Sequence, residues 1–297
     1  MSDNYGHLLI KGYSIIQQYF CIVKIIARIT DLVLYTSLFT ACCALGLCMA
    51  TEKLVTMSAP ALFTHLHVLV FGSTLFVYNT PRVFRKNAKK NGRPYFFWYL
   101  LFFAVGLVMA GYGLVWLSWQ MLLGCIVLGT FTFAYSWPLL PFKNKKRLRD
   151  FGWLKIFVLA SVWTVSTSVL PILIAGKNII DYPFEIMVRF AFIFTLCVVF
   201  DIRDMQADLK NNIYTLPHKV GLRNSYRLIQ LNLLLFAFLS IIQYLHYPLE
   251  KRLAGALATA IITWLVVLYL RKHPSERAYL GLADGVMLVY TVLVLAP

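Results

Sequence analysis

The sequence predicts an all-α, polytopic membrane protein, and three observations carry that prediction. Of its 297 residues, 60% are hydrophobic and 13% are charged, and the mean hydropathy is +0.72, whereas a soluble domain is nearer half apolar and a quarter charged. Apolar runs of about 20 residues recur, which is the length that crosses a bilayer as a helix. The basic residues gather in alternate loops between these runs.

Residues 8–28 are expected to form a helix that lies on the membrane interface. Apolar residues recur there at helical spacing, but Lys11, Lys24 and Arg28 interrupt them, together with two glutamines. That pattern suits an interfacial amphipathic helix better than a tenth span. A charged n-region, a compact apolar core and a cleavage site are not evident, so no secretory signal peptide is expected.

Nine apolar segments are expected to span the membrane. They belong to a single integral membrane domain over residues 1–297, with the cytoplasmic or interfacial helix in 1–29 and a nine-helix bundle in 30–297. The long apolar stretches leave no room for a soluble domain between them. The expected spans are 33–50, 59–79, 95–115, 119–136, 153–174, 184–200, 228–245, 252–270 and 279–296.

Loop charge predicts the orientation. If the N-terminus is cytoplasmic, 23 of the 28 Lys and Arg residues fall on the cytoplasmic side, and Arg189 lies inside a span. Only Lys53, Lys177, Lys251 and Arg252 fall on the other side. The positive-inside rule therefore places the N-terminus in the cytoplasm and the C-terminus across the membrane, which favours the cytoplasmic (inner) membrane as the location. The net charge of +16 is explained by this topology, so a nucleic-acid partner is not expected.

A cluster of aspartates follows the sixth span. Asp201, Asp204 and Asp208 sit at i, i+3 and i+7, and on a continued helix they fall within an arc of roughly 60°. Three like charges on one face repel each other, and a multivalent cation removes that repulsion. Dense hard-oxygen ligands suit Mg²⁺. The alternative is a solvated acidic loop. The cation site is favoured because carboxylates at membrane depth are costly and this chain has few of them.

The stretch around these aspartates resembles the second Asp-rich motif of the UbiA superfamily of intramembrane prenyltransferases. Phe200-Asp-Ile-Arg-Asp-Met-Gln-Ala-Asp208-Leu-Lys210 is followed by Thr215-Leu-Pro217 and Gly221, and the family motif reads DxxDxxxD with a TLP-like tripeptide behind it. A second stretch is similar to the family's Tyr/Pro-rich exit from helix four and its basic loop. It contains Tyr135, Pro138, Lys143, Lys145, Arg147 and Leu154-Lys155.

The resemblance fails at the family's first motif, NDxxDxxxD, at the end of helix two. Asn79 matches its leading Asn, but Thr80, Val83 and Asn87 stand where the family has aspartates. Two accounts stay open. In one, a Mg²⁺ on the surviving motif still holds a diphosphate, and Arg82, Arg85 and Lys86 neutralise the remaining oxygens. In the other, the chain kept the fold and became an isoprenoid- or lipid-binding protein.

If the first account holds, the resemblance implies Mg²⁺-assisted transfer of an isoprenyl group from a prenyl diphosphate to a lipophilic acceptor. Asp201, Asp204 and Asp208 would then be the catalytic metal ligands. The partners are membrane lipids, the prenyl diphosphate and an acceptor that the sequence does not specify. The expected substrate-binding residues are Asn79, Arg82, Arg85, Tyr135, Lys143, Lys145, Arg147 and Lys210.

Two further points bear on competing functions. A transporter is disfavoured by the odd number of spans and by the lack of an evident inverted repeat. Asp284, inside the last span, is a candidate functional acid because intramembrane carboxylates are costly, and it could pair with Arg189 or another buried base. The six cysteines are interpreted as packing residues because they lack metal-ligand spacing.

Overall fold

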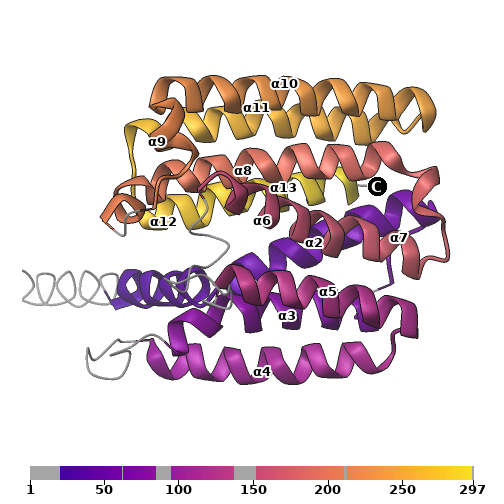
Figure 1. The fold of residues 1–297 in the computed structure, drawn as a ribbon, viewed down its shortest axis with the longest axis horizontal. Coiled ribbons are helices and arrows are strands. Elements are labelled where there is room, and N and C mark those ends of the chain that lie inside the picture. Colours follow the sequence, from indigo (N-terminus) through magenta and orange to yellow (C-terminus); the bar gives the residue numbers. More distant parts are fainter. Residues whose placement is uncertain (1–20, 62, 85–94, 137–151, 211–212, 296–297) are drawn as a thin grey trace, which may run out of the picture.

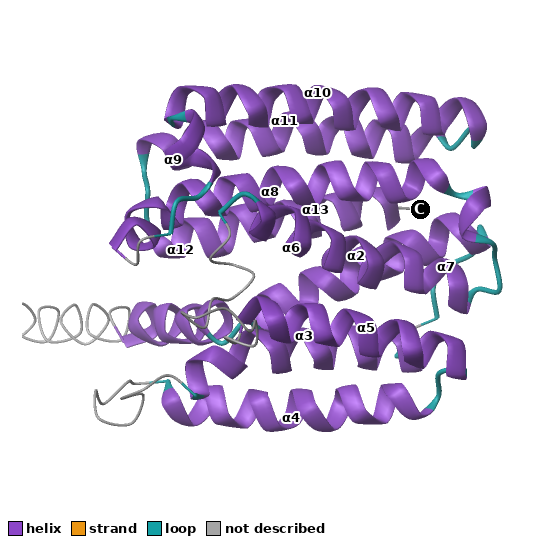
Figure 2. Ribbon diagram, viewed as in Figure 1, coloured by secondary structure: helices purple, strands orange, loops and turns teal. Residues whose placement is uncertain are grey.

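A computed structural model describes residues 21–61, 63–84, 95–136, 152–210 and 213–295, without the side chains of 120 and 131–136. The described residues form helices and loops and contain no strand (Figure 2). The prediction of an all-α membrane protein is therefore confirmed. Residues 21–35 are helical, which is beyond the end predicted for the N-terminal helix at residue 29, and residues 1–20 lie outside the described residues.

Nine long helical segments in the described residues correspond to the nine expected spans. The first four are α2 (Leu38–Thr56), α3 (His65–Val83), α4 (Phe96–Val115) and α5 (Trp119–Ser136). The fifth joins α6 (Leu154–Thr164), the π-helical η2 (Val165–Val169) and α7 (Leu170–Ile174). Then come α8 (Pro183–Lys210), α10 (Leu222–His246) and α11 (Glu250–Lys272), and the ninth joins α12 (Glu276–Ala278), the π-helical η4 (Tyr279–Ala283) and α13 (Asp284–Leu295).

Seven of these segments, within the described part of the chain, are long and apolar enough to cross a membrane. The two others are α3, which carries Asn79 and Arg82 near its end, and α5, which supplies a shorter apolar helix over Met121–Thr130. The largest difference from the expected boundaries is in α8, which continues ten residues past the predicted end to Lys210. All three aspartates of the predicted site therefore lie on a helix.

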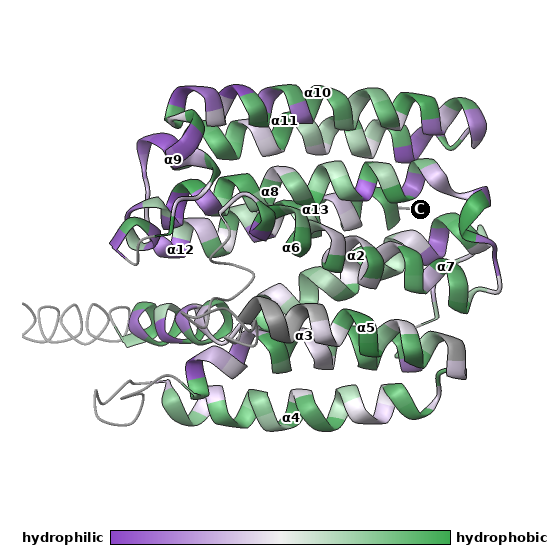
Figure 3. Ribbon diagram, viewed as in Figure 1, coloured by the Kyte–Doolittle hydropathy of each residue, from purple (hydrophilic) through white to green (hydrophobic). Residues whose placement is uncertain are grey.

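The long helices pack side by side in an open ring. From α4 the neighbours run through α3, α2, α13, α11, α10, α8 and α6 to α5. Figure 1 shows α10 and α11 along one edge of the bundle and α4 along the other. The short helices α9 (Leu216–Val220) and α12 lie at one end, where hydrophilic residues gather, and α7 lies at the other (Figures 1 and 3). We call the end with α9 and α12 the polar end.

Small residues let α3 and α4 approach closely. A Cβ added to Gly106 would lie 2.6 Å from the backbone nitrogen of Phe76, and one added to Gly72 would lie 2.5 Å from the Cβ of Met109. Without a hydrophobic force between helices in lipid, such backbone contact is a main source of association. Gly111, on the same helix α4, has open space at its Cβ position.

We expect Gly106→Ala to destabilise the bundle by about 1–3 kcal/mol, because the added methyl group forces α3 and α4 apart. Gly111→Ala is the matched control, and we expect it to be neutral or slightly stabilising because alanine favours helix. Thermal unfolding of both variants in one detergent measures the effect. Equal melting temperatures would contradict the close-packing argument.

Candidate active site

A cavity of about 600 Å³ lies inside the bundle, between α2, α3 and α4 on one side and α5, α6 and α8 on the other. Its lining is mostly apolar, but six acidic and basic side chains reach it: Arg82, Lys155, Asp201, Arg203, Asp204 and Asp284. The cavity therefore joins an apolar body to a charged mouth, a shape that suits an amphiphilic ligand.

Lys155 joins two of the predicted metal ligands. Its Nζ lies 2.5 Å from Oδ1 of Asp201 and 2.6 Å from Oδ2 of Asp208. Lys155 is in the first turn of α6, and the two aspartates are two turns apart on α8. Asp201 and Asp208 therefore lie on one face of α8, as predicted. Because Asp201 is 1% exposed at its side chain, its charge needs a partner at this depth.

The third aspartate has a different partner. Arg203 donates to Asp204 through Nε (2.7 Å) and Nη2 (3.0 Å), the two-pronged arrangement that guanidinium and carboxylate favour. The Arg203 guanidinium also lies over the ring of Phe200, 4.7 Å from its centroid. Asp204 is 41% exposed at its side chain, so solvent screens this pair, and Asp204 stays within reach of a ligand.

The residues at the degenerate first motif tie helices together. The chain leaves helical geometry at Ser37 (φ 59°), and such an interruption leaves carbonyl groups without helical partners. Two of these carbonyls are taken up by α3. Asn79 Nδ2 donates to the carbonyl of Thr36 (2.9 Å), and Arg82 donates to that of Tyr35. Asn79 is fully buried and is not part of the cavity lining.

Arg82 differs from Asn79 because it also lines the cavity. Its guanidinium lies 5.5 Å from the ring centroid of Tyr99, on α4. A guanidinium has five N–H donors, so the bond to Tyr35 leaves donors that a ligand at the mouth can use. The basic character predicted for this stretch is thus present at the cavity, through Arg82.

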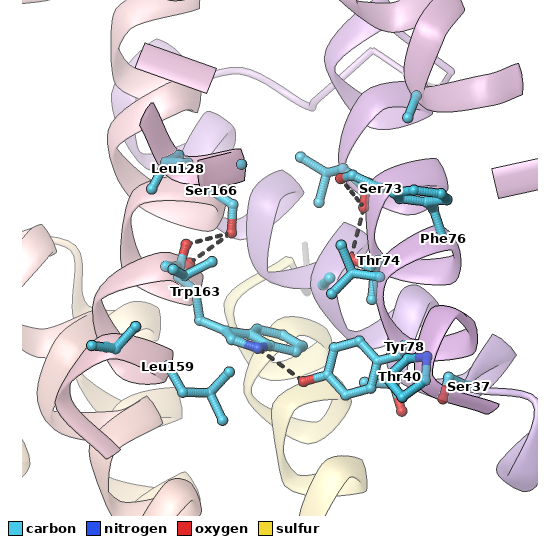
Figure 4. A pocket seen from close by; sticks show the side chains of 18 of the residues that line it. Ser37, Thr40, Ser73, Thr74, Phe76, Tyr78, Leu128, Leu159, Trp163 and Ser166 are labelled. Atoms are coloured by element: carbon cyan, nitrogen blue, oxygen red, sulfur yellow. Dashed lines mark hydrogen bonds between the residues drawn. The ribbon is translucent and has the colours of Figure 1, made fainter. Parts of the chain in front are cut away.

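Aromatic and hydroxyl side chains face the body of the cavity (Figure 4). Trp163 on α6 donates from Nε1 to the hydroxyl of Tyr78 on α3, at 3.1 Å, so the two walls meet there. Ser73, Thr74 and Ser166 also line it, and their hydroxyls donate to carbonyls of their own helices. Because these hydroxyl donors are already used within the helices, the body of the cavity remains largely apolar.

Asp284 also lines the cavity and is 5% exposed. It accepts a hydrogen bond from the Thr40 hydroxyl at 2.8 Å, and it follows directly on the π-helical turn η4. Such π-helical turns are frequent at functional sites. The suggested pairing with Arg189 is wrong, because Arg189 binds Glu185 instead, at 3.1 Å.

A second charged group lies at the opposite end of the bundle. Glu185 is 1% exposed and accepts from Arg189 and Arg252, with further hydrogen bonds from Thr51, Ser168 and Gln243. The Arg189 guanidinium also lies 5.2 Å from the ring centroid of Tyr290. This group, which we call the Glu185 cluster, joins α2, η2, α8, α10, α11 and α13. Arg252, which was counted with the charges on the non-cytoplasmic side at the start of the eighth expected span, is buried in α11.

Among the described residues, the only group of three potential metal ligands with atoms within 4.8 Å of one another is Cys48, Glu52 and His67. His67 Nδ1 accepts from the backbone N–H of Thr64 (3.3 Å), so its proton is on Nε2, which contacts Glu52 at 2.9 Å. That tautomer offers no free nitrogen lone pair. We interpret this group as a structural hydrogen-bond pair beside a thiol.

The structure brings together only part of the predicted substrate site. Asp201, Asp204 and Arg82 line the cavity, Asp208 reaches it through Lys155, and Lys210 is exposed at the end of α8. Arg85, Lys143, Lys145 and Arg147 lie outside the described residues, as does the side chain of Tyr135 on α5. Tyr78 and Trp163 also line the cavity, although neither was predicted from the sequence. Lys155 was predicted only as loop charge and as part of the basic stretch.

One observation indicates that these carboxylates can bind a divalent cation. Asp201 Oδ2 is buried and, among the described residues, has no hydrogen-bond partner, although its other oxygen contacts Lys155. An unsatisfied buried carboxylate oxygen is costly, and a cation ligand would satisfy it. The three aspartates do not converge as one set, but Mg²⁺ is commonly held by one or two carboxylates together with water and substrate phosphates.

Fold and cavity together define the class: an integral, all-helical membrane protein whose internal cavity is charged at one end and apolar beyond it. The model of the UbiA prenyltransferase family matches residues 95–281, more than half of the chain, and the chain belongs to that family. The predicted family resemblance is thereby confirmed. No curated protein matches the sequence.

Two solved structures share the fold. One is from work on digeranylgeranylglyceryl phosphate synthase in membranes; it is 15% identical, has a TM-score of 0.56, and the match covers 91% of this chain and 100% of that one. The other is a UbiA homologue from Archaeoglobus fulgidus bound to Cd²⁺; it is 12% identical, with a TM-score of 0.64 and coverage of 90% and 98%. At these identities the likeness concerns the fold.

Proposed function

We propose that this protein is an intramembrane prenyltransferase that transfers an isoprenyl group from a prenyl diphosphate to a lipophilic acceptor. The observation that carries the proposal is the continuity of the cavity. Arg82, Lys155 and Arg203 stand at its mouth, and an apolar body extends from there between the helices. An anionic head group with a long apolar tail matches both parts at once.

Charge balance at the mouth supports a role for a metal ion. The cations Arg82, Lys155 and Arg203 are matched in number by Asp201, Asp204 and Asp208. These six side chains therefore carry no net charge to offset a diphosphate. Mg²⁺ held by one or two of Asp201, Asp204 and Asp208 would supply that charge and stabilise the leaving diphosphate. A divalent cation in the Archaeoglobus fulgidus homologue is consistent with this.

The chain's own residues have distinct parts in the proposed reaction. Arg82 and Arg203 present guanidinium groups to the diphosphate oxygens, a role for which their planar forks are suited. The bundle keeps water away from the reacting carbon, which limits hydrolysis. Tyr78 and Trp163 line the cavity, and their aromatic rings are proposed to stabilise positive charge on the departing isoprenyl group.

The polar end is proposed to face the cytoplasm. The helices α3, α8 and α11 end here, basic residues follow each of them in the sequence, and the positive-inside rule favours that orientation. The substrate diphosphate would then enter from the cytoplasm, and the acceptor would reach the cavity from the lipid. Lys143, Lys145, Arg147, Arg85, Tyr135 and Lys210 remain candidates for contact with the head group, whereas Asn79 is proposed to hold α3 against the interrupted helix before α2.

A binding experiment tests the proposal without knowledge of the acceptor. The purified protein is titrated with geranylgeranyl thiolodiphosphate, which resists ionisation, and with geranylgeraniol as the head-group control. We expect binding of the thiolodiphosphate to need Mg²⁺, to be lost in EDTA, and to exceed that of the alcohol by at least roughly 100-fold, given the strength of charge-assisted contacts. Equal binding of the two probes would reject a diphosphate site.

The second candidate is a protein that binds isoprenoids without transferring them. The specific observation in its favour is the first motif, where Asn79 and Arg82 tie helices together and no aspartate remains. Incubation with labelled geranylgeranyl diphosphate and extracted membrane lipids separates the two candidates. A prenylated lipid product supports the transferase, and bound but unreacted diphosphate supports the binder.

A further inference from the structure

Lys155 is buried beside the aspartates that are proposed to bind a metal ion. Its side chain is 12% exposed, and its Nζ contacts two carboxylates at 2.5 and 2.6 Å. An ammonium group inside a membrane bundle is stable only when it is paired. Conversely, Asp201 and Asp208 need a cation because two carboxylates this close repel each other. Lys155 supplies that cation from within the chain.

The other cation of the site is held differently. Arg203 is fixed on Asp204 by two parallel bonds and by the ring of Phe200. Lysine has a flexible four-carbon stem and a compact charge with three rotatable donors. The Lys155 ammonium can therefore change partners by side-chain rotation alone, whereas Arg203 would lose a stacked, two-pronged contact.

The backbone that carries Lys155 is fixed. Gly152 just before α6 has φ +56°, and a Cβ there would lie 2.2 Å from the carbonyl oxygen of Tyr214, in the segment after α8. Only glycine allows this close approach. The start of α6 is thereby held against the end of α8, so the ammonium turns about a fixed Cα.

We propose that Lys155 is an exchangeable counter-ion of the metal ligands, an inference that rests on the proposed function. In the empty site its ammonium neutralises Asp201 and Asp208. When these carboxylates ligate a divalent cation, the ammonium leaves them and turns to the diphosphate, which lies in the same cavity that Lys155 lines. One lysine thus stabilises the empty site and then binds the substrate.

This exchange has a thermodynamic consequence. A metal ion that binds alone must displace Lys155 from its two partners, which weakens its binding. With the diphosphate present, the displaced ammonium gains a new partner, so metal and diphosphate bind cooperatively. That coupling is reciprocal, because each ligand raises the affinity for the other by the same factor. Removal of the ammonium abolishes this part of the coupling and leaves the direct attraction between metal and diphosphate.

The test uses Mn²⁺, whose binding is read directly by electron paramagnetic resonance, and geranylgeranyl thiolodiphosphate. In Lys155→Met we expect Mn²⁺ alone to bind about tenfold more tightly and the thiolodiphosphate at saturating Mn²⁺ to bind about tenfold more weakly. Lys272→Met, an exposed lysine at the end of α11, is the control and leaves both affinities unchanged.

The two affinity measurements distinguish this proposal from simpler roles for Lys155. A lysine that only neutralises the aspartates gives tighter Mn²⁺ binding in Lys155→Met without weaker thiolodiphosphate binding, and that result overturns the exchange. Unchanged Mn²⁺ affinity overturns it as well. No thiolodiphosphate binding by the native protein at any Mn²⁺ concentration overturns the proposed function and this inference together.

Should Lys155→Met fail to fold, the native protein gives the answer. Acetic anhydride is applied to the protein alone, with Mg²⁺, and with Mg²⁺ plus thiolodiphosphate, and acetylation of each lysine is read by mass spectrometry. With Mg²⁺ alone, Lys155 leaves its two carboxylates and its acetylation rises, while the thiolodiphosphate then protects it. Lys272 is the internal reference. The same Lys155 acetylation in all three conditions contradicts the exchange.

Discussion

Asp201→Asn is expected to lower the affinity for geranylgeranyl thiolodiphosphate in Mg²⁺ by roughly 100-fold, which corresponds to about 2.8 kcal/mol. Asp201 is the most buried of the three motif aspartates, and it has one oxygen on Lys155 and another without a partner among the described residues. An amide keeps the shape but removes the charge that a cation needs. Calorimetric titration in detergent measures the change.

The matched control for this variant is Asp181→Asn. Asp181 is exposed in the short 3-10 helix Ile179–Asp181, in the loop before α8, far along the chain from the motif. We expect its affinity to equal that of the native protein. Asp204→Asn should cost less than Asp201→Asn, because Asp204 is 41% exposed and paired with Arg203. Native affinity in Asp201→Asn would exclude the metal-site hypothesis.

Glu185→Gln is expected to destabilise the protein by about 3–5 kcal/mol, the usual cost of leaving buried charges without their partner. The substitution leaves Arg189 and Arg252 without a carboxylate, in a site where Glu185 is 1% exposed. The group joins six helical elements, so its loss affects the whole bundle. Unfolding by sodium dodecyl sulfate in mixed micelles measures the free energy of unfolding.

Two comparisons make the Glu185 result specific. Glu250→Gln, at the exposed start of α11, is expected to have little effect. Replacement of Glu185, Arg189 and Arg252 together by Met is expected to recover most of the lost stability, because an apolar group of similar volume often matches a buried ion pair. If the single and triple variants are equally unstable, the defect is one of packing and not of unpaired charge.

Local sequence properties were sufficient to locate the long helices along the chain. Runs of apolar residues decide which segments enter lipid, and the surrounding basic residues mark their ends, so the nine segments matched the helices to within several residues. The boundaries failed where a polar stretch continued a helix. Asp201 through Lys210 are too polar for a span, yet they extend α8 because Lys155 and Arg203 neutralise the aspartates.

The candidate site was only partly predictable for a related reason. The DxxDxxxD spacing is local, so Asp201 and Asp208 could be placed on one helical face. The partner of that face is Lys155, which lies 46 residues before Asp201 in the chain. Nothing in the sequence around Lys155 distinguishes it from the other basic residues of the loop. The same holds for Tyr78 and Trp163, which meet only because α3 and α6 are neighbours across the cavity.

By itself, the sequence determined that this chain is an all-helical membrane protein of the UbiA family, because hydropathy and a short acidic motif are properties of contiguous residues. The tertiary structure decided what each charge does. It placed Asn79 and Arg82 on the carbonyls of an interrupted helix, Lys155 between two aspartates, and Arg252 on Glu185. In lipid a charge must find a partner within the protein, and which partner it finds depends on helices that meet only after folding.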